Sequence, residues 1–303
     1  MRMQIAAALL FASLAACHGG GDSTSGPTFG QTGVPFTSFS AVQANQTVNM
    51  QGMSTTVTGT LSGSTVSTIS AFATDTTATT GKLTYDGARA LSAVTVTPPA
   101  GAITFSRGTN DTFNCVSGTC GLTNSAGTAA MVMMEPISLP APNNWNYQTF
   151  GVWNRSNSAT SFDAGVFSFG AATPASAVPS VGTATFTGLA NGFFASSAGS
   201  AFFTSASMTA NANFGTASIT FSTINTQTVP IAGGSTAFRP DLNLTGTFNY
   251  LSGSNLFSGP VSATGLAGTA TGRFYGPAAQ EIGGVYNLSG TAGSMMGSFG
   301  GKQ

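Results

Sequence analysis

The chain has 303 residues, enough for one large domain or two modest ones, and only 5% of them are charged, against about 25% in typical soluble domains. Lys and Arg together number 8, as do Asp and Glu, so the formal net charge is zero. A nucleic-acid partner is excluded, because phosphates require clustered cations, and no apolar run of 18 residues is present to form an internal membrane helix.

The first 17 residues carry the strongest local signal. Residues 1–4 are basic, and residues 5–14 are apolar but too short to span a bilayer, which is typical of a secretory signal peptide. They lead into Leu14-Ala15-Ala16-Cys17, which resembles the lipobox of bacterial lipoproteins, where the thiol accepts diacylglycerol and the freed amine is acylated. We therefore predict a signal peptide at 1–16, lipidation at Cys17 and outer-membrane lipid as a partner; the alternative is an ordinary signal peptide with a chance cysteine.

A Gly- and Ser-rich segment follows, and we assign residues 17–35 to a flexible tether. His18, rather than Asp, follows the lipidated cysteine, which fits sorting to the outer membrane. It is the one histidine of the chain and is expected to be inert in the tether. The predicted location is the cell outer membrane, lipid-anchored and surface-exposed, with a periplasm-facing orientation left open.

Strands are predicted over most of the remaining chain. Thr and Phe suit a pleated, half-buried surface, and Gly and Ser interrupt it. Apolar and hydroxyl residues alternate with a period of two, which is typical of antiparallel strands with one buried face. The clearest windows are 54–61, 92–97, 182–188 and 242–250, and a single helical turn is predicted at 276–281. The fold class is therefore all-β.

Cys115 and Cys120 flank a short turn, Val116-Ser117-Gly118-Thr119. An exported chain meets an oxidising environment, so a disulfide between them is the default. A metal site would need further thiols or a histidine, and a redox-active pair would need a helix N-terminus or a basic neighbour. We therefore predict a structural disulfide.

Three prolines within residues 136–142 indicate a boundary, because proline cannot donate a hydrogen bond inside a ladder. Residues 36–140 are then a small β-rich region, and residues 141–303 a closed, soluble antiparallel barrel of eight strands, filled by its own side chains. Segment 224–241 is expected to be a loop. Candidate barrel strands lie at 145–154, 162–170, 181–189, 200–210, 213–223, 242–250, 264–275, 280–288 and 293–300.

Both tryptophans lie in the aromatic segment 145–153. With a period of two, Trp145, Tyr147 and Trp153 share one face, and Phe150 and Val152 share the other. The segment either packs in the core or forms a stacking surface for a flat ligand such as haem. A haem iron would need an axial ligand, for which the mature chain offers Tyr and Met but no histidine beyond the tether.

Two phenylalanine pairs flank a later Ser- and Gly-rich stretch. We expect Phe193, Phe194, Phe202 and Phe203 to lie at exposed loop tips and to contact a partner, with packing inside a hairpin as the alternative.

The sequence contains no recognisable set of catalytic residues. Ser-His-Asp and Cys-His nucleophile systems need a histidine on the fold, the carboxylates form no motif, and no phosphate-binding glycine pattern follows a strand. We predict a non-enzymatic protein with no cofactor and no metal site.

Residues 272–286, Gly-Arg-Phe-Tyr-Gly-Pro-Ala-Ala-Gln-Glu-Ile-Gly-Gly-Val-Tyr, resemble the signature of the transferrin-binding protein B barrel family. Segments 211–220 and 297–303 are similar to two further strands of that family. The signature residues on which the resemblance depends are Gly272, Phe274, Tyr275, Gly276, Pro277, Glu281, Gly283 and Gly284. The residue types alone indicate the same turn. We expect Gly276-Pro277 to force the chain out of the ladder and Gly283-Gly284 to allow a bulge or a close backbone approach. The Glu281 carboxylate is expected to accept hydrogen bonds from turn amides.

The resemblance implies a soluble eight-stranded barrel beside a β-rich handle, displayed by lipid and tether, with export by a surface-lipoprotein translocon. We expect a binding module that captures a protein or nutrient ligand, including iron- or haem-related ones, for an outer-membrane receptor; the ligand stays open. The alternative is a structural or adhesive surface lipoprotein. An integral outer-membrane pore is not expected, because the chain ends in Gly301-Lys302-Gln303 and begins with a lipobox.

Overall fold

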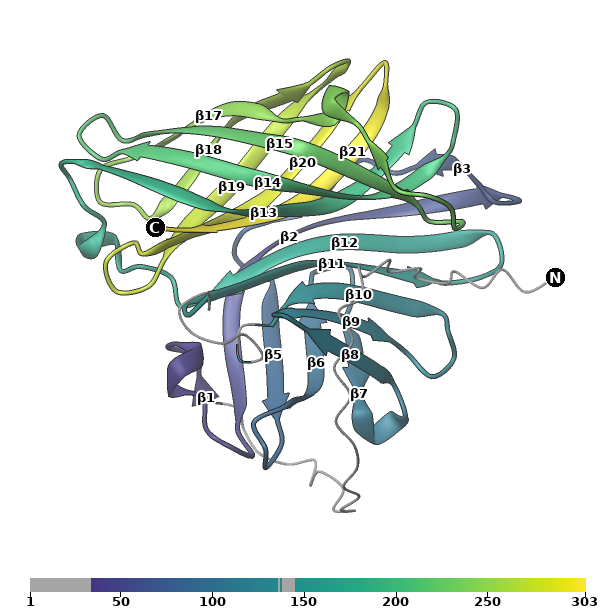
Figure 1. Ribbon diagram of the computed structural model, residues 1–303, viewed down its shortest axis with the longest axis horizontal. Coiled ribbons are helices and arrows are strands. Elements are labelled where there is room, and N and C mark those ends of the chain that lie inside the picture. Colours follow the sequence, from purple (N-terminus) through teal and green to yellow (C-terminus); the bar gives the residue numbers. More distant parts are fainter. Residues whose placement is uncertain (1–33, 136, 138–144) are drawn as a thin grey trace.

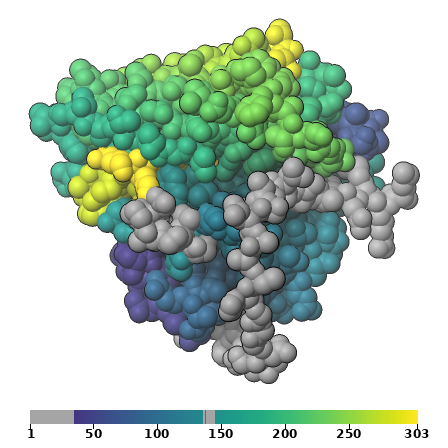
Figure 2. Space-filling model, viewed as in Figure 1, coloured from purple at the N-terminus to yellow at the C-terminus, as the bar shows by residue number. Residues whose placement is uncertain are grey.

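The computed structural model describes residues 34–135, 137 and 145–303, and these form two β-sheets packed against each other. The barrel strands, green to yellow, lie over the purple and blue strands of the other sheet (Figures 1 and 2). Short 3-10 turns connect some strands: η1 (Phe39–Ala41), η2 (Arg107–Thr109), η4 (Ala175–Ala177) and η5 (Pro240–Leu242). In this described part, no helix has the length and apolar character needed to cross a membrane.

The first sheet is curled and has 12 described strands, paired in the order β7-β6-β5-β2-β12-β11-β10-β9-β8, with β1, β3 and β4 also on β2. Its strands are β1 (Val34–Pro35), β2 (Thr47–Ser62), β3 (Thr65–Ile69), β4 (Ala73–Asp75), β5 (Thr80–Tyr85), β6 (Leu91–Thr97), β7 (Ile103–Ser106), β8 (Thr112–Val116), β9 (Thr119–Thr123), β10 (Ala129–Met134), β11 (Gln148–Ser156) and β12 (Ser161–Gly170). Its concave side encloses an apolar core that includes Val48, Leu83, Val94, Phe105 and Phe167.

The second sheet closes into a barrel. Its strands are β13 (Thr183–Ser196), β14 (Ala201–Asn213), β15 (Ser218–Pro230), β16 (Ala237–Phe238), β17 (Thr245–Tyr250), β18 (Leu256–Ala263), β19 (Leu266–Tyr275), β20 (Glu281–Gly290) and β21 (Gly293–Lys302). The order β14-β13-β21-β20-β19-β18-β17-β15 returns to β14 through a β14–β15 pairing, and β16 is a two-residue addition to β15. Eight strands thus form the closed ring.

Phenylalanine side chains fill the interior of this barrel. The ring centroids of Phe221, Phe248 and Phe299 lie 4.9 to 6.3 Å apart, within the range of favourable aromatic contacts. All three rings are almost completely buried. The interior is therefore a packed core, as expected for a barrel of this size.

The all-β class and the closed eight-stranded C-terminal barrel are confirmed. The assignment of segments 145–154 and 162–170 to the barrel was wrong, since β11 and β12 pair in the first sheet, where β12 runs antiparallel to β2 from Ser161↔Thr60 to Gly170↔Gln51. The period-two pattern identifies a strand and its buried face, but it does not identify the partner strand.

Three further expectations differ from the structure. Residues 224–230 continue β15 rather than forming a loop, and a register shift opposite Ser205 and Ser207, with Asn225 at φ 57°, absorbs the irregularity. Strand β18 was missed because it contains Pro260, and proline is rarely found inside a strand. Residues 276–279 form a turn without helix, and Glu281 already begins β20.

The two sheets share an apolar and hydrogen-bonded junction. Val57, Val152 and Val166 of the first sheet pack against Val285 and Met296 of the barrel. The Gln148 amide Nε2 donates to the Ile282 carbonyl at 2.7 Å, and the Ser298 hydroxyl donates to the Gly151 carbonyl at 3.0 Å. Buried polar contacts of this kind fix how the two parts sit on each other.

Candidate ligand-binding site

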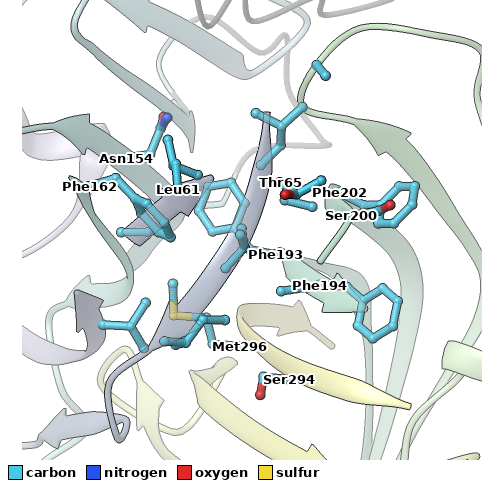
Figure 3. Close-up of a pocket in the computed structure, with 18 of the residues that line it drawn as sticks. Leu61, Thr65, Asn154, Phe162, Phe193, Phe194, Ser200, Phe202, Ser294 and Met296 are labelled. Atoms are coloured by element: carbon cyan, nitrogen blue, oxygen red, sulfur yellow. The ribbon is translucent and has the colours of Figure 1, made fainter. Parts of the chain in front are cut away.

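A cavity of about 500 Å³ lies where the end of the barrel meets the first sheet. Leu61 and Phe162 come from the first sheet, and Phe194, Phe202 and Met296 come from the barrel (Figure 3). The volume is in the range of small-molecule sites, which occur preferentially between domains.

The β2–β3 hairpin forms one wall. Gly63 makes its turn at φ 64°, a backbone conformation that favours glycine, and Leu61, Val66 and Ile69 line the cavity from this hairpin. The Val66 amide donates to the Gly199 carbonyl of the barrel at 2.8 Å. This bond holds the hairpin against the barrel and closes one side of the cavity.

The β13–β14 hairpin forms the opposite wall. Phe193 pairs with Phe203 across the two strands, and Phe194 pairs with Phe202, so the pairs lie on opposite faces. The Phe193 and Phe203 rings join the apolar junction between the sheets, whereas Phe194 points into the barrel core. The expectation of exposed loop tips was wrong, because the tip is residues 197–200 and all four phenylalanines belong to the strands.

Three of these four phenylalanines, Phe193, Phe194 and Phe202, line the cavity. Figure 3 shows Phe193 between Leu61 and Phe162 on one side and Phe194 and Phe202 on the other. Whether they contact a partner stays a prediction.

Among the residues that the structure describes, no charged side chain lines the cavity. Arg155 and Asp163 are adjacent in sequence to the lining residues Asn154, Phe162 and Ala164, but they alternate onto the other face and pair with each other at 2.7 Å. Burial works to raise the Asp163 pKa, but hydrogen bonds from Arg155, Asn157 and Thr58 outweigh it and hold the pKa below the ordinary value.

A second cation lies near the cavity and is also paired. The Arg239 guanidinium stands over the Phe194 ring, 5.5 Å from its centroid, and pairs with Asp241 at 2.7 Å. The hydrogen bond from Arg239 lowers the Asp241 pKa against the opposing effect of burial. Both nearby cations are thus neutralised by their own carboxylates.

The Glu281 carboxylate of the signature turn lies at the other end of the junction, only 3% exposed. Its Oε1 accepts hydrogen bonds from the amides of Asn146 at 2.6 Å and Tyr147 at 3.2 Å. We expected amides of its own turn; the donors instead belong to the segment that enters β11. Burial raises the Glu281 pKa to about 7, although the amide donors and Lys302 act to lower it.

The remainder of the signature turn is also tied to the first sheet. Gly276 has φ 85°, which favours glycine, and its amide donates to the Ala171 carbonyl at 2.8 Å, while Pro277 follows in the turn. The Tyr275 hydroxyl and the Ser168 hydroxyl share a hydrogen bond of 3.0 Å, and Phe274 lies in the barrel core. In this geometry the signature turn attaches the barrel to the first sheet.

The signature glycines permit a close approach rather than a bulge. Gly272 pairs with Gly284, and Gly283 pairs with Arg273, in a β19–β20 ladder without a register shift. A Cβ on Gly283 would collide with the Gln148 side-chain oxygen. The packing of the Gln148 and Ser168 side chains against β20 therefore depends on the absence of a side chain at Gly283.

The cysteines and tryptophans lie away from the cavity. Cys115 and Cys120 form the predicted disulfide across the β8–β9 hairpin, and Cys17 lies outside the described residues. Trp153 lies in the first-sheet core, whereas Trp145 packs edge-on against Phe150 at 5.4 Å. The prediction that the two tryptophans share one face was wrong, because β11 begins only at Gln148.

Most of the cavity-lining residues that come from the first sheet were not predicted from the sequence. Val57, Leu61, Ile69, Phe72 and Phe162 line the cavity, yet each reads as an ordinary apolar strand or turn residue. One feature could have indicated this wall of the cavity. Strand β2 spans 16 residues, more than the strands that pair with it, and it still carries an apolar residue, Leu61, one position before its end. Within the described residues, no group of three His, Cys, Asp or Glu side chains is placed to hold a metal ion.

Known protein families and solved structures include proteins that are similar to this chain. Residues 178–303 match the model of the C-lobe and N-lobe beta barrels of Tf-binding protein B. No curated protein matches the chain.

A mutant transferrin-binding protein B from Haemophilus parasuis Hp5 is similar in fold, with a TM-score of 0.50 and 15% identity over 83% of this chain and 45% of the matched one. The isotype 1 protein of serogroup B Neisseria meningitidis gives 0.37 and 14%, over 86% and 77%. A structure described as a surface lipoprotein gives 0.40 and 13%, over 82% and 98%. This chain spans less than half the length of the Haemophilus protein that it matches.

Proposed function

We propose that this chain, whose residues 178–303 match the model of the transferrin-binding protein B barrels, is a lipid-anchored surface protein that captures a ligand without transforming it. The observation that carries the proposal is the cavity at the junction of the two sheets, which is apolar and, within the described part of the chain, lined by no titratable side chain. General acid–base and nucleophilic catalysis need such groups beside the substrate, whereas binding needs shape and apolar area.

The anchoring part of the proposal is supported by the sequence. On this view residues 1–16 are removed, Cys17 carries the lipid, and residues 17–33 tether the two sheets to the outer membrane. The predicted tether 17–35 ends two residues earlier, because Val34 and Pro35 form β1 and pair with β2. The other partners are an outer-membrane receptor or a surface-lipoprotein translocon. Cys17→Ser should release the mature protein from the membrane fraction, and labelled palmitate should be incorporated into the wild type alone; retention of the variant in the membrane would contradict the anchor.

Capture is tested with the mature chain carrying Cys17→Ser. The protein is incubated with growth medium, serum or envelope extract, and bound molecules are identified by native mass spectrometry. Ser294→Phe places a ring in the cavity, and Ser258→Phe makes the same change on the exposed face of β18. We expect the wild type and Ser258→Phe to hold one added mass that Ser294→Phe largely loses. Equal loading of all three proteins, or of none, would refute capture at this site.

A further inference from the structure

The cavity also restricts the chemistry of what it can hold. Its lining combines branched aliphatic side chains, phenylalanine rings and the Met296 thioether, and its uncharged polar groups include the Asn154 amide and the Ser294 hydroxyl. Figure 3 places Asn154 and Ser294 at opposite edges of the labelled apolar group. Burial of an aliphatic chain in the apolar interior is favourable, and the polar groups at either edge can form hydrogen bonds with a neutral head group.

A charged head group is disfavoured by the surroundings. A carboxylate or phosphate drawn into the cavity would be desolvated without a free cation to pair with, because Arg155 and Arg239 are each occupied by an aspartate. The same reasoning applies to haem, whose propionates would be unpaired. The described residues of the lining provide one methionine for the iron and no His, Tyr or Cys.

A flat polycyclic ligand is disfavoured by the ring geometry. Phe194 and Phe202 stack on each other at 6.0 Å, and Phe193 meets Phe203 edge-on at 6.4 Å. The rings are thus paired among themselves and do not present two parallel faces with a gap between them. A flexible chain can follow such a lining where a rigid plate cannot.

We propose that the cavity binds one uncharged aliphatic chain with a neutral polar head, as in a long-chain alcohol or a monoacylglycerol. This inference rests on the proposed capture function and names the class of its ligand. The volume of about 500 Å³ accommodates a single such chain rather than a bilayer lipid with two chains and a charged head.

The test is a calorimetric titration of the delipidated mature chain carrying Cys17→Ser with octan-1-ol, decan-1-ol and dodecan-1-ol, and with decanoate and hemin at pH 8. We expect affinity for the alcohols to rise about fourfold for each buried methylene and decanoate to bind at least about tenfold more weakly than decan-1-ol. Ser294→Phe should abolish alcohol binding and Ser258→Phe should preserve it, with both variants checked for wild-type circular dichroism.

Failure of the ligand class is distinguishable from failure of the function. Binding of decanoate or hemin as tight as that of decan-1-ol, or affinity independent of chain length, would overturn the neutral aliphatic ligand. If an extract ligand were still captured in a Ser294-dependent manner, the proposed function would stand. Absence of binding in both experiments would remove both proposals.

Discussion

Glu281 is a buried carboxylate whose hydrogen-bond donors lie about 135 residues away in the sequence, at Asn146 and Tyr147. Charge in such a site is costly, and burial raises the pKa of Glu281 from its ordinary 4.5 to about 7. A pKa higher in the folded than in the unfolded state means that the folded protein binds the proton more tightly. The contribution to stability is therefore complete below pH 4.5 and is lost as pH rises through 7.

We predict that the free energy of unfolding falls between pH 5 and pH 8, by at most about 3 kcal/mol, in urea titrations of the wild type. Glu281→Gln should flatten this dependence because the side chain no longer titrates. Asp163 and Asp241, whose pKa values are lowered, lose their contributions only in more acidic solution, outside this window. An unchanged pH slope in Glu281→Gln would assign the effect to another group.

Gly283 lies against the buried Gln148 side chain of the other sheet, which hydrogen bonds to the Ile282 and Gly301 carbonyls hold in place, so a Cβ there would collide with it. Gly283→Ala should lower the free energy of unfolding by about 1–3 kcal/mol through overpacking. Gly87→Ala is the matched control, because a Cβ on Gly87 meets nothing closer than 3.5 Å. If the two variants are equally stable in chemical denaturation, the junction accommodates the added methyl group and the prediction is wrong.

At the scale of elements, β8 is one end of the strand order of the first sheet within the described residues, and β7 is the other. Ser117 and Gly118 form the two-residue turn of the β8–β9 hairpin with φ values of 50° and 79°, and Cys115 lies directly opposite Cys120. The disulfide thus ties the edge strand β8 to its neighbour β9 beside the turn. Because β8 has a single strand neighbour, this hairpin is expected to open before the rest of the sheet.

Replacing both cysteines, Cys115→Ser with Cys120→Ser, should cost about 2 kcal/mol, as estimated for closing so short a loop. Hydrogen exchange should accelerate most in β8 and β9, which also open locally, and less in β17 and β18 of the barrel. Uniformly faster exchange across both sheets would instead indicate that the hairpin supports the whole fold.

At the scale of the whole molecule, the apolar junction joins the two sheets into one unit. Val285 is 1% exposed and packs with Val152 and Val166 of the first sheet. A shared interface of this kind couples the unfolding of the parts it joins.

Val285→Ala should therefore destabilise both sheets together by about 1–3 kcal/mol. Tryptophan fluorescence reports on Trp153 in the first sheet and on Trp145, which packs against Phe150 of the same sheet. Hydrogen exchange in β17 and β18 reports on the barrel. We expect both probes to shift by the same amount. A first sheet that unfolds while the barrel amides remain protected would refute a single cooperative unit.

Local pattern was enough to predict the all-β class, the Cys115–Cys120 disulfide and seven of the eight barrel strands, whereas the number eight also rested on the family resemblance. Alternation with a period of two records which side of a strand is buried, and a disulfide between cysteines five residues apart is determined by the turn between them. The signature around Gly276-Pro277 indicated the barrel family whose model matches residues 178–303, because its glycines and proline serve one particular turn.

Only the tertiary structure decided that β11 and β12 join the first sheet, that the Glu281 donors come from Asn146 and Tyr147, and that Phe193 faces Leu61 and Phe162 across a cavity. Backbone hydrogen bonds are the same for every strand, so the partner of a strand is chosen by the packing of both its faces over the whole chain. In the sequence, each residue that lines the cavity is indistinguishable from a residue of an ordinary apolar core. The cavity and the class of ligand that fits it exist only once the two sheets are packed together.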